Sequence, residues 1–357
     1  MGLWDRLLGH IRSVSNPPMV IRIPSDQVAG GYEPRPFRVQ DDYLRLWASD
    51  MLLRYDRIGP WSVTPGVQSL VVLTFGDQRQ EVPGLVGPAK IARVEAKGRS
   101  GVRTERQVLT QLMPYRGGLV EIEAALLQLP GEDYFGAFMD VLGGLSEIVS
   151  LGEVSTGLDV ANKLGDGIGG LLGVSGEGKL VLGWMSDFAE AGRTPLLPGY
   201  VAVLPQGSID PAELYVSDGL LHRRSADGAE RIDDVDYLLL EIEQQQARAD
   251  WESLRSISKP LQRAQEYLDG GDAANAEAFF KAAIIATRQT SDLTGSDKKR
   301  AIADILARTP PGAPAQAETT ESSLPTIRSL GFDTDAELRP QTQAGGLDPY
   351  SPDAADA

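Results

Sequence analysis

The stretch "QSLVVLTF", residues 68–75, is the clearest strand signal in the sequence. Most of its residues are branched or aromatic, and Gly76-Asp77 follows it directly. Branched side chains pack well on a pleated sheet, and a glycine-containing pair lets the chain reverse direction. A reversal without a crossover helix joins antiparallel strands. The stretch therefore predicts an antiparallel hairpin.

Five other segments have the same character, because each is rich in branched residues and bounded by Gly, Pro or Asp. They are 19–23, 90–96, 119–129, 179–184 and 200–205. Ser217-Asp218-Gly219 supplies a second turn signal. We expect an α+β domain over residues 17–225, with a mixed, largely antiparallel sheet and a few helices.

Three helices are predicted within this domain, over 41–58, over 131–149 and from Leu151 to about Gly173. The first has one apolar stripe, preceded by two carboxylates where an N-cap acceptor belongs. The stripe consists of Leu44, Trp47, Met51 and Tyr55, and the carboxylates are Asp41 and Asp42.

The third predicted helix contains glycine patterns that resemble phosphate loops. Residues 165–170 fit G-x-G-x-x-G, and 173–179 fit G-x-x-x-x-G-K, but Leu180 replaces the hydroxyl residue and a strand follows. We therefore expect no nucleotide cofactor. Small residues recur every four positions, which favours close packing against the protein's own sheet, self-association or membrane insertion. This ridge consists of Gly157, Ala161, Gly165, Gly169 and Gly173.

Residues 233–308 are dominated by helix formers and predict an all-helical module. The segment 235–257 is expected to form one long helix, with a break or kink at Pro260 near its end, because proline interrupts helical hydrogen bonding. The segment 261–289 predicts two helices joined at 269–272.

Small and bulky residues in this helix pair follow a recognisable order. Ala264 and Tyr267 precede a Gly-Asp turn, and Ala276, Phe280 and Ala283 follow it at three-to-four-residue spacing. The pattern resembles a tetratricopeptide-repeat helix pair. It covers under a tenth of the chain and has no second copy. The resemblance implies a protein-binding helical hairpin, and a lone pair must pack on a neighbour to bury its apolar face.

Both ends of the chain predict interaction segments. Residues 1–15 form an amphipathic helix that packs on the protein itself, on a partner or on a bilayer, with Leu3, Trp4, Leu7, Leu8 and Ile11 on its apolar face. Residues 310–357 are proline-rich and polar, which predicts a disordered acidic tail. Its apolar island is a candidate docking motif, through Leu324, Ile327, Leu330 and Phe332.

Composition excludes several classes of function. The net charge of −16 repels nucleic acid. The chain has no cysteine and two histidines, which disfavours thiol catalysis and Cys- or His-based metal sites. No segment offers about 18 uninterrupted apolar residues, so no membrane-spanning helix is expected. We expect no metal or cofactor. We also expect a cytoplasmic protein, and peripheral contact with a membrane is an alternative that the sequence leaves open.

Three residues are candidate ligand contacts. Glu121 and Glu123 alternate on a predicted strand, so both point to one side, which suits a carboxylate pair, a cation site or an exposed strand face. Arg116 lies in the turn-like segment 114–118, where it receives a carboxylate or phosphate or is simply solvated.

The leading functional hypothesis is a non-catalytic adaptor. Its helical module and tail recruit protein partners, and its α+β domain is a scaffold or senses a ligand. Two other classes remain open: a membrane-acting effector that uses the N-terminal or the glycine-ridged helix, and a hydrolase that uses Glu121 and Glu123. Homo-oligomerisation is compatible with each of the three.

Overall fold

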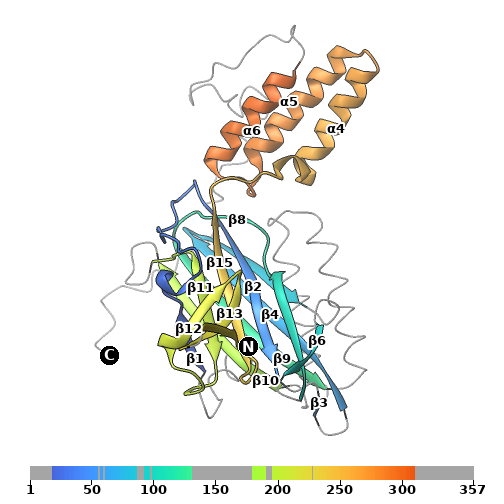
Figure 1. The fold of residues 1–357 in the computed structure, drawn as a ribbon. Coiled ribbons are helices and arrows are strands. Elements are labelled where there is room, and N and C mark those ends of the chain that lie inside the picture. The colour runs from blue at the N-terminus through green and yellow to red at the C-terminus, as the bar shows by residue number, and fades with distance from the viewer. Residues whose placement is uncertain are drawn as a thin grey trace, which may run out of the picture. The chain divides into compact units, whose positions relative to one another are not determined.

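Two antiparallel sheets, a small third sheet and three α-helices make up the described part of the chain (Figure 1). The computed structural model describes residues 18–54, 57–58, 61–86, 92–96, 99–130, 179–189, 195–226 and 228–309. The expectation of a mixed, largely antiparallel α+β protein is confirmed for these residues. The predicted glycine-ridged helix, the helix at 131–149, the N-terminal helix and the tail lie outside them.

The five-stranded sheet is built around the predicted hairpin. β4 (Trp61–Phe75) and β5 (Gln78–Val86) pair antiparallel through the two-residue turn Gly76-Asp77. β9 (Leu119–Pro130) pairs with the other edge of β4, β10 (Lys179–Ala189) pairs with β9, and β3 (Arg57–Ile58) pairs with β4. The predicted strands at 68–75, 119–129 and 179–184 are thus confirmed.

The seven-stranded sheet joins distant parts of the sequence. Its order is β1 (Met19–Arg22), β11 (Gly199–Leu204), β15 (Tyr237–Gln245), β2 (Tyr43–Leu53), β7 (Arg99–Val108) and β6 (Ala92–Ala96), and β8 (Met113–Pro114) also pairs with β2. All of its strand pairs are antiparallel. The predicted strands near 19–23, 90–96 and 200–205 are confirmed.

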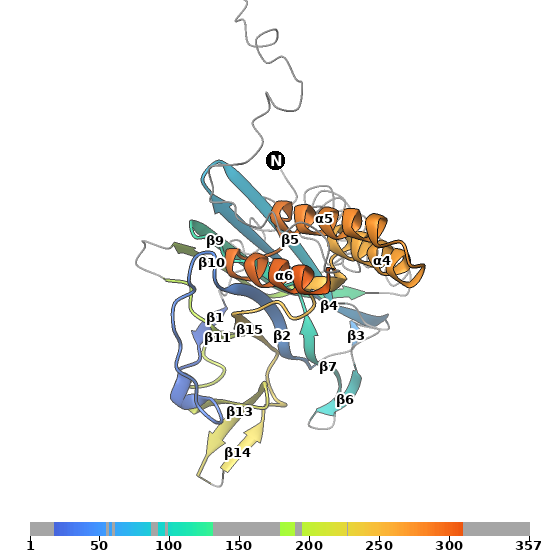
Figure 2. The ribbon, with the colours of Figure 1, turned by 90° about the horizontal axis from the view of Figure 1, so that it is seen from above.

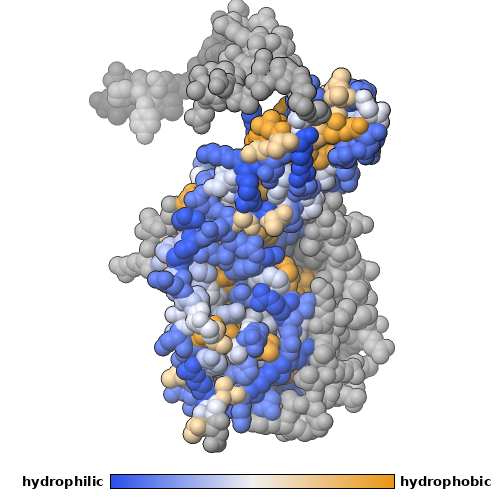
Figure 3. Space-filling model, turned by 45° about the horizontal axis from the view of Figure 1, so that its top comes forward, coloured by the Kyte–Doolittle hydropathy of each residue, from blue (hydrophilic) through white to orange (hydrophobic). Residues whose placement is uncertain are grey.

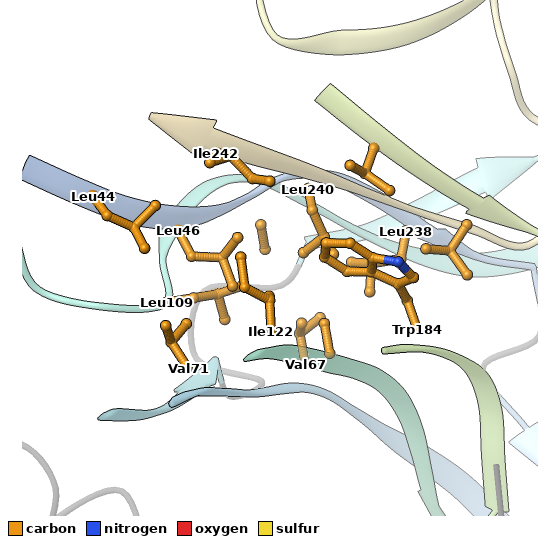
Figure 4. Close-up of a cluster of buried hydrophobic side chains, with 14 of the residues drawn as sticks. Leu44, Leu46, Val67, Val71, Leu109, Ile122, Trp184, Leu238, Leu240 and Ile242 are labelled. Atoms are coloured by element: carbon orange, nitrogen blue, oxygen red, sulfur yellow. The ribbon is translucent and has the colours of Figure 1, made fainter. Parts of the chain in front are cut away.

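The main hydrophobic core lies between these two sheets (Figure 4). Leu44 and Leu46 of β2 and Leu238, Leu240 and Ile242 of β15 face Val67 and Val71 of β4, Ile122 of β9 and Trp184 of β10. Aligned packing of two inner faces is the usual construction of a β-sandwich. At one edge the sheets approach closely, because a Cβ on Gly84 would overlap the carbonyl oxygen of Leu109.

The helix predicted over 41–58 is wrong, because residues 43–53 form β2. A bulge at Ser49 shifts the register, so Leu240 pairs with Ala48 and Leu239 with Asp50. The bulge interrupts the period of two and places apolar residues at spacings that imitate a helix. Trp47 is not in the core: its indole lies between the guanidinium groups of Arg45 and Arg106.

The two aspartates expected to cap that helix have other partners. Asp42 is buried and accepts hydrogen bonds from the Arg35 guanidinium at 2.8 and 3.0 Å and from the Arg38 amide at 2.7 Å. Asp41 accepts a hydrogen bond from the Ser296 hydroxyl. Both carboxylates therefore organise the loop before β2, not a helix end.

The single helix predicted over 235–257 is also wrong, because residues 237–245 form β15 and α4 begins only at Arg255. Both faces of this strand are buried: Leu238 and Leu240 contribute to the core between the sheets, and Tyr237 and Leu239 contribute to a second cluster on the other side. A strand buried on both sides shows no alternation of apolar and polar residues, so its sequence cannot be distinguished from a buried helix by periodicity.

The third sheet covers part of the outer face of the seven-stranded sheet. It consists of β12 (Leu214–Ser217), β13 (Leu220–Ser225) and β14 (Gly228–Arg231), and the predicted turn contains Asp218 and Gly219 at positive φ. Buried Asp50 of β2 holds it in place. Its carboxylate accepts hydrogen bonds from the Leu221 amide at 3.0 Å, the Arg231 guanidinium at 3.0 Å and the Tyr237 hydroxyl at 2.6 Å.

Helices α4 (Arg255–Asp269), α5 (Ala273–Gln289) and α6 (Gly295–Arg308) lie side by side (Figures 1 and 2). The segment 261–289 contains the C-terminal part of α4 and all of α5, with a turn after Asp269, and the binding role that its resemblance implies stays a prediction. Ala264, Ala276, Phe280 and Ala283 are buried together, and Tyr267 stacks on Phe279. Pro260 lies inside α4, so the helix does not break there.

A buried polar cluster, which we call the clasp, joins β2 to α6. The Tyr43 hydroxyl donates to the Asp297 carboxylate at 2.7 Å and accepts from the Thr294 amide at 2.9 Å. The same Asp297 oxygen accepts from the Arg248 amide at 2.6 Å. Around the clasp, the Gly295 amide donates to the Gln40 carbonyl. The Tyr43 hydroxyl thus both donates and accepts a hydrogen bond across the boundary between the sheet and the helix.

We predict that Tyr43→Phe lowers the free energy of unfolding by about 1–3 kcal/mol, because it leaves a buried amide and carboxylate without their shared partner. Urea denaturation followed by circular dichroism measures the change. Tyr215→Phe, on the small sheet, is the matched control and should shift stability by less than about 0.5 kcal/mol. Equal effects of the two substitutions would contradict the role of the clasp.

Candidate functional site

Carboxylates from three strands form a row across the five-stranded sheet. Glu121 of β9 is paired in register with Asp187 of β10. On its other side Glu121 pairs with Val72 of β4, which in turn pairs with Glu81 of β5. Residues in register on neighbouring antiparallel strands place their side chains on the same face. We call Glu81, Glu121, Glu123 and Asp187 the acidic patch.

The patch lies on the face that points away from the main core. Ile122, between the two glutamates, packs in the core between the sheets, so Glu121 and Glu123 point outward. The expectation that these two side chains share one side of a strand agrees with this register. Their environments differ: Asp187 is exposed, Glu121 is half-buried and Glu123 retains only 9% of its surface.

The pKa of the Glu123 carboxyl group is raised to about 7. Burial is the largest cause, and the negative charges of Glu121 and Asp187 add to it. Arg79 opposes this effect, but its guanidinium already pairs with Glu81 at 3.0 Å. Glu123 consequently holds its proton in the pH range where exposed glutamates have lost theirs.

Gln68 of β4 lies beside the buried end of the patch. It pairs with Ala125, two residues from Glu123 on the same face of β9, and only 1% of its surface is exposed. Neither its Oε1 nor its Nε2 atom has a hydrogen-bond partner, and Glu123 Oε2 also lacks one. Buried polar atoms without partners are rare, and each costs about 1–3 kcal/mol.

The patch does not have the geometry of a metal centre. Among the residues that the structure describes, no group of three or more His, Cys, Asp or Glu side chains is arranged to hold a metal ion. The carboxylate oxygens and the Gln68 Oε1 atom all accept hydrogen bonds, so they suit a ligand with N–H groups.

Arg116 lies at the boundary between sheet and helices. Its guanidinium donates to the Ser291 carbonyl in the α5–α6 loop at 2.6 Å and stacks over the Phe75 ring at 4.9 Å. Gly118, two residues after Arg116, has φ of +79°, and a Cβ there would overlap the Thr74 carbonyl. Arg116 therefore links the turn before β9 to the helices.

A second cation lies near Arg116. Burial, and then the positive charge of Arg116, lowers the pKa of the Lys298 ammonium group. Lys298 donates to the Arg288 carbonyl at 2.9 Å, and no described carboxylate forms an ion pair with Lys298 or Arg288. Arg116, Lys298 and Arg288 together form a positively charged region on a chain whose net charge is −16.

The remaining candidates are not brought to this site. The glycine ridge, the apolar residues of the N-terminal helix and the docking island of the tail lie outside the described residues. Sequence reasoning missed Asp187, Gln68 and Lys298. Only the strand register brings Asp187 and Gln68 to Glu121 and Glu123, because each lies on a different strand. None of the described helices is long and apolar enough to cross a bilayer.

We predict that Glu123→Gln removes a pH-dependent loss of stability. The folded state holds a proton on Glu123 up to about pH 7, whereas an ordinary glutamate releases it near 4.5. Wild-type stability should therefore fall as the pH rises between these values, by up to about 3 kcal/mol, and level off above pH 7.

The glutamine variant has no carboxyl group to titrate at this position. Its free energy of unfolding relative to that of the wild type should therefore rise from pH 4.5 to pH 8. Urea denaturation at both pH values measures the difference. Glu230→Gln, an exposed glutamate of β14, is the control and should follow wild type. A Glu123→Gln profile parallel to wild type would contradict the buried proton.

No protein-family model, curated protein sequence or solved structure matches this chain. The function is therefore inferred from the chain's own residues and their contacts.

Proposed function

We propose that the protein is a non-catalytic adaptor whose sheets form a scaffold that presents a helical docking surface. The observation that carries this proposal is the clasp, in which Tyr43 and Asp297 fix α6 to β2 through buried hydrogen bonds. A surface held on a rigid support loses less conformational entropy when a partner binds. The clasp supports a binding role because it holds α6 against β2 while Ile285 of α5 and Leu306 of α6 are exposed.

The docking surface consists of one stripe on each helix. The Lys298 ammonium group of α6 donates to the Arg288 carbonyl of α5, so the end of α5 lies beside the start of α6. Ile285 is 52% exposed and Leu306 is 42% exposed, and Figure 3 shows hydrophobic residues among hydrophilic ones on the helices. The α5–α6 face comprises Ala274, Ala278, Ala282, Ile285 and Arg288 on α5, and Lys298, Ile302 and Leu306 on α6.

The chemistry of this face indicates its partner. Small alanines on α5 allow another backbone to approach, and Ile285 and Leu306 offer apolar contacts. Neither Arg288 nor Lys298 forms an ion pair with a carboxylate among the described residues. An acidic amphipathic segment of a protein partner satisfies both requirements, in the manner of a helix that lays its apolar face in a groove.

We predict that Ile285→Glu with Leu306→Glu weakens partner binding at least tenfold, because both substitutions place charge at the centre of the face and repel an acidic partner. In-cell crosslinking of the full chain, followed by quantitative mass spectrometry, measures the partners retained. Val20→Glu with Val108→Glu is the control, because these valines of the seven-stranded sheet are 43% and 44% exposed.

Partners that survive the helical substitutions but not the control substitutions would contradict the proposal. Deletion of residues 310–357 separates the contribution of the tail. If the same partners are retained without the tail, its apolar island is not a docking motif for them.

A carboxylate-dependent hydrolase is the second candidate, and the raised pKa of Glu123 supports it. A carboxyl group that stays protonated near pH 7, beside a second carboxylate, is the arrangement of a general acid and its partner in carboxylate enzymes. Glu123 would donate the proton and Glu121 would activate water or attack.

The test is a panel of glycoside and ester substrates. If the hydrolase proposal holds, any hydrolysis by the purified chain should fall at least 100-fold in the Glu121→Gln, Glu123→Gln double variant. Activity retained by that variant would remove the acidic patch from consideration as a catalytic site.

A further inference from the structure

We infer that the acidic patch binds an alkylammonium ligand, with Asp187 and Glu121 at its solvent-exposed end and Glu123 and Gln68 at its buried end. This small-molecule site is separate from the α5–α6 face and goes beyond the adaptor role. A short diamine such as putrescine has the chemistry that the site requires.

The first argument is electrostatic. Glu121 and Asp187 are in direct register on neighbouring strands, where like charges destabilise a sheet. Among the described residues neither has a hydrogen-bond or ion-pair partner, and Glu123 follows on the same face. Of the four carboxylates, Glu81 is the one with an ion pair to a described residue, Arg79. The patch therefore carries an uncompensated negative charge that a bound cation would offset.

The second argument is independent of the carboxylates. Gln68 is buried, lies on the same face as Glu123 and has no partner for either polar atom of its amide. Gln68 is opposite Ala125 and Leu70 is opposite Glu123, so Gln68 and Glu123 are diagonal neighbours on this face. A neutral amide without partners is not explained by charge repulsion, but an N–H donor at this point would satisfy Gln68 Oε1 and Glu123 Oε2 together.

The third argument concerns shape. Glu121 and Glu123 are two residues apart on β9, which corresponds to roughly 6–7 Å along the strand. Exposure decreases in order from Asp187 through Glu121 and Glu123 to Gln68. One ammonium group would bind between Asp187 and Glu121, and the second would bind Glu123 and Gln68. A metal ion is disfavoured because the described side chains form no chelating group of three.

Isothermal titration calorimetry of the full chain with putrescine at pH 8 and matched ionic strength tests this inference. We expect saturable binding that Glu121→Gln with Glu123→Gln weakens at least 30-fold. Glu213→Gln with Glu230→Gln removes the same charge from exposed positions elsewhere and should leave the dissociation constant within twofold. Equal loss in both double variants would show general charge attraction and overturn the inference.

Gln68→Leu provides a second readout. It removes the unpartnered amide, so it should not lower the melting temperature of the free protein, yet it should weaken putrescine binding at least fivefold. Unchanged binding by this variant would overturn the buried end of the site. Butylamine, with one ammonium group, should bind at least tenfold more weakly than putrescine, and equal affinities would overturn the two-point arrangement.

The source of the alkylammonium group is resolved by a further titration. Nα-acetyl-lysine methylamide, which stands for a lysine of a protein, should bind more weakly than putrescine if the ligand is a free diamine, and a tighter complex would overturn that assignment. Displacement of putrescine by equimolar Mg²⁺ would identify a metal site instead. Ile285→Glu with Leu306→Glu should leave putrescine binding intact, which separates this test from that of the adaptor role.

Discussion

The structure depends on β2, because this one strand pairs within the seven-stranded sheet, packs in the main core and also holds the small sheet and α6. Its inner face, with Leu44 and Leu46, packs against the five-stranded sheet. The bulge at Ser49 then turns Asp50 outward, where it holds the small sheet through Leu221, Arg231 and Tyr237. At its start, Tyr43 binds α6. A buried carboxylate without these partners would be strongly destabilising.

The same strand explains where sequence reasoning succeeds and fails. The β4–β5 hairpin is predictable because Gly76-Asp77 makes a local turn between residues that are neighbours in sequence. β2 and β15 are not, because a bulge disrupts the alternation in β2 and burial on both faces removes it from β15. The two strands pair with each other across more than 150 residues of sequence, and such tertiary contacts override local propensity.

The candidate site shows the same division. The common face of Glu121 and Glu123 follows from their spacing on one strand. The proximity of Asp187 and Gln68 follows from register, which a single sequence does not specify. Arg116 was recognisable as a turn residue, but its contacts with Ser291 and Phe75 depend on the placement of the helices. Pairing between strands, and not residue type, determines which charges meet.

The clasp also determines how the molecule comes apart. Opening α6 would expose the hydroxyl of Tyr43 together with Asp297, and would also release the Arg248 amide and the Gly295–Gln40 bond. Local opening of α6 would therefore break all of these contacts together. A proteolytic nick between β15 and α4 would leave the helices bound to the sheet by these buried contacts.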